Sequence, residues 1–259
     1  MKIVVPVKVV PDTAATLKVE GGKVTWGDAP LVLNPWDEFA VEAALQTVEQ
    51  HGGTVAVISM GDESALEAIR KALAMGAKEA VRIHDDALAG ADVFVTAQVL
   101  AAAVRKMGDV DMVFFGRQAV DGDTGLTPMY TARALGWPFV GLVSAFTEMD
   151  PAGRTFAAER SVGEAKQTIQ APMPAVVTIA KEFAEPRYPS FMGIRKASRA
   201  KVPVWSLADL GLDAPAAKVR WPEITMPPKR EVKVEFIEGA TPREIAEKLV
   251  DKLIEAKVL

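Results

Sequence analysis

The chain has 259 residues, 49% hydrophobic and 25% charged, which is ordinary for a globular protein of one large domain with an appendage or of two small domains. Its net charge of −4 argues against a dedicated nucleic-acid binder, which normally presents a basic face. The absence of cysteine and the presence of only two histidines exclude thiolate chemistry and Cys-ligated metal sites, and argue against a zinc site or a Ser-His-Asp triad.

The chain is predicted to open with a β-strand. Residues 2–10 are rich in Val and Ile and end at a Pro-Asp turn signal. This apolar start runs into the turn without a cleavage site, so we interpret it as a strand and not as a signal peptide. Because the sequence has no apolar run of about 18 residues, we expect no membrane span and a cytoplasmic protein.

Strands and helices then alternate up to residue 135. A hairpin is predicted around Gly21 and Gly22. Asn34 is expected to cap the first helix, with Pro35 at its first position and acidic residues in its first turn. Further strands are predicted at 54–60, 79–84 and 111–115, and helices at 34–51, 61–76, 96–107 and from 124 or 127 to 135. This alternation indicates βαβ units and a parallel sheet with right-handed crossovers.

The loop after the fourth of these strands has features of a phosphate site. Residues 116–125 contain three glycines and two aspartates, and they lead into a helix with Pro128 in its first turn. A strand, a Gly-rich loop and a helix N-terminus together present unpaired backbone N–H groups, which suit a phosphate. Neither GxGxxG nor GxxxxGK[ST] occurs, so an ordinary βα turn is the alternative. Since ligands bind beyond the carboxyl ends of parallel strands, we expect this loop to share one crevice with residues 7–13, 59–62 and 84–86.

The second half of the chain follows other patterns. Residues 139–149, 154–161 and 165–169 predict an antiparallel meander, and residues 175–180 a buried strand. Residues 185–199 are interpreted as a loop with aromatic, Met and basic side chains, a composition enriched at interfaces; alternatively, its Phe folds back into the core. Residues 202–230, with five prolines, are interpreted as an extended arm against a partner chain, followed by a capped amphipathic helix from Thr241 that we expect to dock.

Several motifs together resemble the β subunit of electron transfer flavoproteins. In chain order they are VKVVPDT (7–13), NPWDEFAVEAAL (34–45), ALAMGA (72–77), GRQAVDGDTG (116–125), PAVVT (174–178) and EPRYPSFMGIRKA (185–197). The resemblance covers residues 1 to about 200. It implies a three-layer α/β/α fold with a mostly parallel Rossmann-like sheet, an antiparallel meander insertion and a C-terminal extended arm plus helix. The nucleotide-binding domain is then expected at 1–200, including the partner recognition segment 185–199, with the arm and helix at 201–259 docking on the partner subunit.

The resemblance also implies cofactors. The redox-active FAD sits mainly on a separate α subunit, and the β subunit holds a second nucleotide, AMP or, in electron-bifurcating members that oxidise NADH, FAD. GRQAVDGDT resembles the bifurcating branch, whereas Leu126 and Pro128 replace its usual Gln and Gly, and Thr127 is common in the AMP-binding branch. The choice therefore stays open. The residues implied to contact the second nucleotide are Pro6, Val7, Asn34, Pro35, Trp36, Asp37, Met60, Gln118, Asp121, Gly122, Asp123, Thr124, Gly125, Leu126, Thr127, Pro128 and Met129.

Partners are implied in the same way. Phe191 stands where the family has the apolar anchor that docks into a dehydrogenase, and the basic residues after it would steer that encounter. The docking residues implied are Tyr188, Phe191, Met192, Ile194, Arg195 and Lys196. The partners implied are the α subunit, acyl-CoA or other flavoprotein dehydrogenases, and a quinone reductase or ferredoxin-type acceptor.

The function implied is that of an electron carrier subunit, which needs no catalytic residue and no metal of its own because the cofactors supply the chemistry. Two other functions stay open from the residues. One is a stand-alone ATP-binding protein or ATPase of similar fold, with Asp121 and Asp123 placed for Mg²⁺. The other is a purely structural subunit with a vacant pocket.

Overall fold

The computed structural model describes residues 1–163, 165–219, 221–228 and 234–258. The chain divides into two compact units, Met1–Ile224 and Thr225–Leu259. The first is built on a large β-sheet flanked by helices, and the second contains helix α6 (Pro242–Glu255). The predicted α/β class is confirmed. No helix among the described residues is long and apolar enough to cross a membrane.

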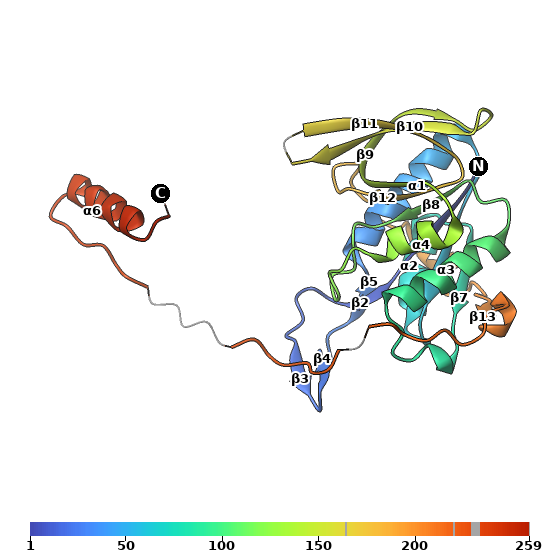
Figure 1. Ribbon diagram of the computed structural model, residues 1–259, viewed down its shortest axis with the longest axis horizontal. Helices are drawn as coiled ribbons and strands as arrows, with labels where there is room; N and C mark the ends of the chain where they lie inside the picture. Colours follow the sequence, from blue (N-terminus) through green and yellow to red (C-terminus); the bar gives the residue numbers. More distant parts are fainter. Residues whose placement is uncertain (164, 220, 229–233, 259) are drawn as a thin grey trace. The chain divides into compact units, whose positions relative to one another are not determined.

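The large sheet is mostly parallel. Its strand order is β11-β10-β9-β12-β8-β1-β6-β7-β13 (Figure 1). Its strands are β1 (Lys2–Pro6), β6 (Thr54–Met60), β7 (Glu79–Ile83), β8 (Met112–Phe115), β9 (Phe139–Asp150), β10 (Thr155–Val162), β11 (Ala165–Pro172), β12 (Ala175–Ile179) and β13 (Val204–Trp205). In this sheet, antiparallel pairing joins β9 to β10 and β10 to β11. The predicted meander is therefore confirmed, and Glu164 in its second turn lies outside the described residues.

Two small antiparallel pairs lie beside the large sheet. They are β2 (Val9–Pro11) with β5 (Leu31–Leu33), and β3 (Lys18–Glu20) with β4 (Lys23–Thr25). The second pair is the hairpin predicted from its glycines. The first shows that the prediction of one strand over residues 2–10 was wrong. The chain leaves the large sheet after Pro6, because the Lys8 N–H donates to the Asp37 carboxylate (2.8 Å) and Val9 then pairs with Leu33.

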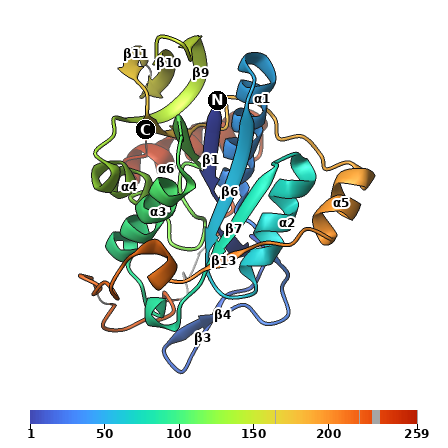
Figure 2. The same cartoon turned by 90° about the vertical axis from the view of Figure 1, so that its right-hand side faces the viewer.

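Helices cover both faces of the sheet, as the two sides of Figure 2 show. Helices α1 (Pro35–His51) and α2 (Ala65–Met75) lie on one face, and α3 (Val93–Met107) and α4 (Thr127–Leu135) on the other. Successive side chains of a strand point to opposite faces, so Ile3 belongs to the α1/α2 core and Val4 to the α3/α4 core. The predicted three-layer architecture is confirmed.

Two helices differ from their predicted limits. Helix α3 begins three residues early because the Asp92 side chain accepts a hydrogen bond from the Val95 N–H (2.8 Å) and caps it. The segment predicted as a loop at 185–199 contains helix α5 (Phe191–Ser198). Ser190 caps α5 by accepting from the Gly193 N–H (3.0 Å). A serine at this N-cap position is a local helix-start signal, but the preceding prolines favoured the prediction of a loop.

The first part of the predicted arm packs on the α/β unit. Strand β13 pairs with β7, and the 3₁₀ turn η2 (Ala208–Leu210) follows it. Leu207 is only 4% exposed, and Trp205 and Leu210 pack against the α3/α4 core. The extended interpretation was wrong for this part, because burying these apolar side chains is favourable. Arg220, Lys229 and Arg230 of the predicted arm lie outside the described residues.

The connections create a switch in the strand order. From β1 the chain adds β6 and then β7 on one side, and β8 is placed on the other side of β1. Open α/β sheets bind ligands at such a switch, beyond the carboxyl ends of the strands. Here those ends are Pro6 of β1 and Phe115 of β8. The topology therefore directs attention to the loops after these two strands.

Candidate functional site

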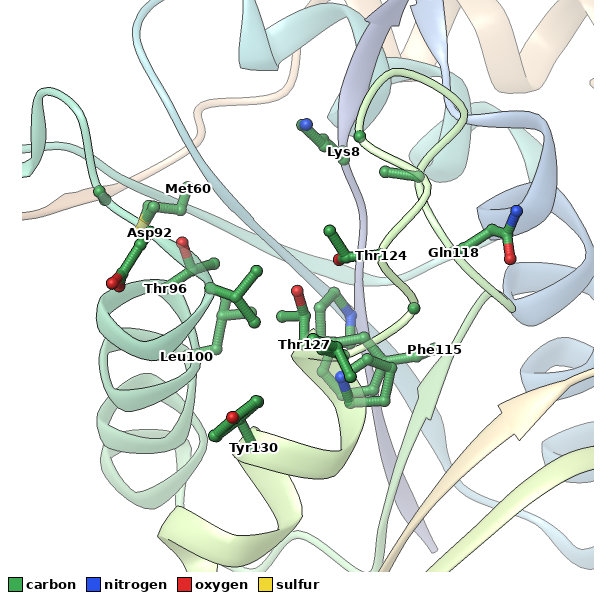
Figure 3. A pocket seen from close by; sticks show the side chains of 18 of the residues that line it. Lys8, Met60, Asp92, Thr96, Leu100, Phe115, Gln118, Thr124, Thr127 and Tyr130 are labelled. Carbon is green, nitrogen blue, oxygen red and sulfur yellow. The ribbon is translucent and has the colours of Figure 1, made fainter. Parts of the chain in front are cut away.

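A cavity of about 750 Å³ lies at this switch point. In Figure 3, Thr96 and Leu100 of α3 stand on one side of it, and Thr124 and Thr127 on the other. Most residues implied to contact a nucleotide line this cavity: Pro6, Val7, Asp37, Met60, Gln118, Gly122, Asp123, Thr124, Gly125, Leu126, Thr127 and Pro128. Segments far apart in the sequence thus meet as expected. Residues 84–86 do not line it, since β6 separates β7 from β1.

The other residues implied to contact the nucleotide do not line the cavity, but one of them, Asn34, holds the loop in place. Asn34 occupies the N-cap position of α1, yet its side chain forms no cap. It is fully buried, donates to the Gln118 carbonyl (2.9 Å) and accepts from the Val120 N–H (3.2 Å). Pro35, Trp36, Asp121 and Met129 are absent from the lining. The asparagine therefore fastens the loop to helix α1.

The loop backbone has two left-handed residues and several N–H groups for which no acceptor is found among the described residues. Asp123 and Gly125 adopt positive φ angles of 54° and 61°, a region that Asp tolerates better than most residues and Gly occupies freely. The N–H groups of Thr124, Gly125 and Leu126 have no backbone acceptor among the residues that the structure describes. Helix α4 follows immediately, and in its first turn the N–H groups of Thr127 and Met129 have no intrahelical acceptor by geometry, whereas Pro128 has no N–H. Such a cluster of N–H groups binds phosphate or carboxylate groups.

Lys8 lies in the segment 7–13 that was expected at this crevice, although it was not among the residues implied to contact the nucleotide. Lys8 lines the cavity, and its ammonium is paired with the carboxylate of Asp121 (2.6 Å). The side chain of Lys8 is half exposed, so a bound anion could share it. The available signal was its position directly after the first strand in VKVVPDT.

Asp37 forms a buried acidic part of the lining. Burial raises the pKa of its carboxyl from 3.8 to about 7, although the hydrogen bond from the Lys8 N–H acts in the opposite direction. The approach of β8 to this carboxyl is close, because a side chain at Gly116 would overlap the backbone of Trp36 and an Asp37 oxygen (both 2.5 Å). The glycine therefore allows the strand end and the helix start to meet.

The opposite wall was not predicted. It contains apolar and aromatic side chains of α3, β8 and α4, with the rings of Phe94 and Tyr130 edge to face at 6.4 Å. Three residues of the arm, Lys218, Val219 and Trp221, complete the lining. Nothing in the local sequence marks these residues, because only the packing of distant segments brings them together.

The predicted docking segment forms a second surface of the α/β unit. Arg187 is anchored on α1 by contacts to Glu42 (2.7 Å) and Glu49 (2.6 Å). Helix α5 then packs on α2 at Gly193, where any side chain would overlap the Ala74 carbonyl. The apolar side chains in and before this helix are largely exposed: Tyr188 (96%), Phe191 (80%), Met192 (68%) and Ile194 (53%). Phe191 therefore does not fold back into the core. Arg195 and Lys196 lie on the same helix and are also exposed.

Comparisons with known proteins agree on one family. Residues 24–210 match the model of the electron transfer flavoprotein domain. The chain is 38% identical to Protein FixA of Azorhizobium caulinodans, with 82% of this chain and 78% of that protein covered. It is 35% identical, over the whole of both chains, to the caffeyl-CoA reductase-Etf complex subunit CarD of Acetobacterium woodii. It is 38% identical to the electron transfer flavoprotein subunit beta of Mycobacterium leprae, with 82% and 81% covered.

Proposed function

We propose that this chain, which belongs to the electron transfer flavoprotein family as a β subunit, holds a nucleotide in the cavity beside β1 and β8. The observation that carries the proposal is the row of N–H groups at Thr124, Gly125 and Leu126, which have no backbone acceptor within the described part of the chain and lie at the N-terminus of α4 and at the switch point of the sheet. These groups suit a phosphate, and the apolar wall suits the rest of a nucleotide.

In this assignment each part of the cavity has a task. The loop N–H groups and the N-terminus of α4 bind the phosphate, and Lys8 adds a positive charge at the same end. Asn34 keeps the loop in place through Gln118 and Val120. The flavin of the complex supplies the redox chemistry, and this chain binds and orients the groups around it. The ATPase alternative is disfavoured, because Lys8 already engages the Asp121 carboxylate that would have to hold Mg²⁺.

Replacing Lys8 with glutamine is expected to lower the amount of nucleotide that copurifies with the complex. The change removes the positive charge and leaves Asp121 without its partner, so the phosphate is both less attracted and more repelled. The bound nucleotide is released by heat, separated and quantified per complex. The control is Lys18→Gln, an exposed lysine on the distant hairpin strand β3. Unchanged content in the Lys8 variant would contradict the assignment of this end to phosphate.

The same measurement on the unmodified complex identifies the nucleotide. One FAD with one AMP per complex means that the cavity holds AMP, as in an ordinary carrier. Two FAD molecules mean that the cavity holds FAD, as in a bifurcating member. Turnover of ATP by the isolated chain would favour the ATPase alternative, and a cavity without any nucleotide would favour the structural subunit.

The second surface is proposed to receive the dehydrogenase. Exposed apolar anchors flanked by basic residues are typical of transient docking sites, where the anchors supply affinity and the charges speed the encounter. Helix α6 exposes the apolar side chains of Ile245, Leu249 and Ile254, and we propose that it docks on the α subunit, as expected for residues 201–259. The dehydrogenase class and the quinone reductase or ferredoxin-type acceptor also remain proposals.

Phe191→Ala is expected to slow electron transfer from the dehydrogenase by about tenfold at low protein concentration, because a central aromatic anchor commonly contributes more than 1 kcal/mol of binding. Flavin content should stay the same, since Phe191 is exposed and away from the cavity. The rate of flavin reduction is measured by rapid mixing. Leu17→Ala, at an exposed apolar residue outside this segment, is the control. Equal rates for Phe191→Ala and the unmodified protein would refute the docking role.

A further inference from the structure

The arm passes along the cavity that the loop after β8 defines. Lys218, Val219 and Trp221 line the same space as Met60 and Thr124, although they follow them by many residues in the chain. All of these residues belong to the unit Met1–Ile224. The arm is therefore part of the cavity wall and not only a connection to the C-terminal helix.

The carboxylate of Asp92 accepts hydrogen bonds from the arm at this position. One oxygen of Asp92 accepts the Val95 N–H (2.8 Å) and caps α3, and the other accepts the N–H groups of Lys218 (2.5 Å) and Val219 (2.8 Å). Burial would raise the pKa of Asp92, but the hydrogen bonds from Val95, Val219 and Lys218 outweigh it and hold the pKa below its usual range. The carboxylate is therefore ionised at neutral pH, and hydrogen bonds to an ionised acceptor are the strong ones.

The side chains of this segment offer what a nucleotide requires. The Lys218 ammonium lies 6.0 Å from the centre of the Phe94 ring, whose edge-to-face partner is Tyr130. Trp221 adds an indole that lines the cavity and remains 76% exposed. Both side chains have surface left to contact a ligand, because neither is enclosed by the protein.

We infer that the arm forms a ligand-contacting wall of the nucleotide site, with Lys218 and Trp221 as binding residues and Asp92 as the positioning residue that fastens them. The inference rests on the proposed nucleotide function. Detachment of the arm from Asp92 removes one wall of the site, so an attached arm is expected to slow release of the ligand. The chain runs on from Trp221 into the unit Thr225–Leu259. Docking of that unit on the α subunit would therefore be linked to nucleotide retention, and the linkage is reciprocal.

The variant Val219→Pro tests whether the arm retains the ligand, because it removes the N–H that donates to Asp92 while the carboxylate stays intact. The complex with its α subunit is loaded with labelled AMP or, in parallel, with FAD, and release is followed after addition of excess unlabelled ligand. Val219→Pro is expected to release the ligand about tenfold faster, since it loses a charge-assisted hydrogen bond. Ala216→Pro places a proline at an exposed residue of the same arm that does not line the cavity, and is expected to release the ligand at close to the original rate.

The possible failures are distinguishable. Equal release from Val219→Pro and the unmodified complex, with normal loading, overturns the arm as a wall and leaves the proposed function standing. An unmodified complex that binds neither AMP nor FAD overturns both. A second measurement needs no variant: amide hydrogen exchange at Lys218 and Val219 should slow when the cavity is saturated with the ligand that binds. Exchange that is independent of the ligand would also overturn the inference.

Discussion

Replacing Arg187 with alanine is expected to lower the free energy of unfolding by about 3 kcal/mol, because it leaves the buried carboxylate of Glu42 without its cation. The Glu42 side chain is only 3% exposed, and the Arg187 guanidinium contacts it twice, at 2.7 and 3.0 Å. Burial alone would raise the pKa of Glu42, but the hydrogen bonds from Arg187 and Gln46 outweigh it and lower the pKa below 4.5. The expected loss of about 3 kcal/mol is near the lower end of the range for breaking a buried ion pair, since Arg187 is itself one-third exposed.

Two further variants test whether the loss of stability comes from the buried Arg187–Glu42 pair. Arg195→Ala removes a positive charge from the same segment, at a residue without an ion-pair partner among those the structure describes, and should change stability little. Adding Glu42→Gln to Arg187→Ala should recover part of the loss, since the stranded charge is gone. Unfolding by urea measures all four proteins. If Arg187→Ala unfolds at the same denaturant concentration as the unmodified chain, the anchoring role is wrong.

The stability that the Arg187–Glu42 pair contributes is expected to depend on pH. A carboxyl group with a lowered folded pKa adds stability that is present above its unfolded pKa and is lost as the pH falls through the folded value. The difference between Arg187→Ala and the unmodified chain should therefore be full at neutral pH and shrink below about pH 4.5. The exposed helix α5 begins four residues after Arg187, so this pair also positions the segment that we propose as the dehydrogenase contact.

The second large effect is expected from Asp37→Asn, which should flatten the pH dependence of stability between about pH 4 and pH 7. In the folded chain, burial raises the pKa of Asp37 from 3.8 to about 7. A carboxyl group with a raised folded pKa adds stability that is fully present below the unfolded value and is lost as the pH rises through the folded one. The shift corresponds to about 4 kcal/mol across that window, at about 1.4 kcal/mol per pH unit.

Asparagine imitates the protonated acid and keeps an oxygen for the Lys8 N–H, which lies 2.8 Å from the Asp37 carboxylate. Its unfolding free energy should therefore lack the steep fall that the unmodified chain shows as the pH rises. Urea unfolding at several pH values measures the difference, with Asp28→Asn, at an exposed acid, as the control. Parallel curves for the unmodified chain and Asp37→Asn would show that Asp37 keeps an ordinary pKa in the fold.

Local signals explain which features could be predicted from the sequence. The hairpin around Gly21 and Gly22, the buried strands and the Gly-rich loop after β8 each depend on residues close together in the chain. The start of α4 at Thr127, one of the two predicted positions, likewise follows from Pro128 in its first turn. The nucleotide and docking residues remain predictions, although the structure brings most of the former to one cavity and leaves the latter exposed.

Local caps at Asp92 and Ser190 account for the missed starts of α3 and α5, and long-range contacts account for other differences from the prediction. The first strand ends at Pro6 because the carboxylate of Asp37, far along the chain, takes the Lys8 N–H. Helix α5 rests on α2 because Gly193 allows its backbone to approach the Ala74 carbonyl. Asn34 was expected to cap a helix and instead holds Gln118 and Val120. In the first and third cases a polar group pairs with a distant residue, and in the second a glycine permits close packing against a distant helix. Spacing along the sequence reveals neither.

The sequence by itself determined the α/β class, the meander and the family of this protein, because hydrophobic periodicity, turn residues and motifs are written in consecutive residues. The tertiary structure decided how the strand ends meet at the switch between β1 and β8, that Lys8 lines the cavity at this switch, and that Lys218 and Val219 of the arm donate hydrogen bonds to Asp92. These features depend on contacts between buried and charged groups that are far apart in the sequence and meet only once the sheet has formed. Patterns of neighbouring residues therefore do not predict them.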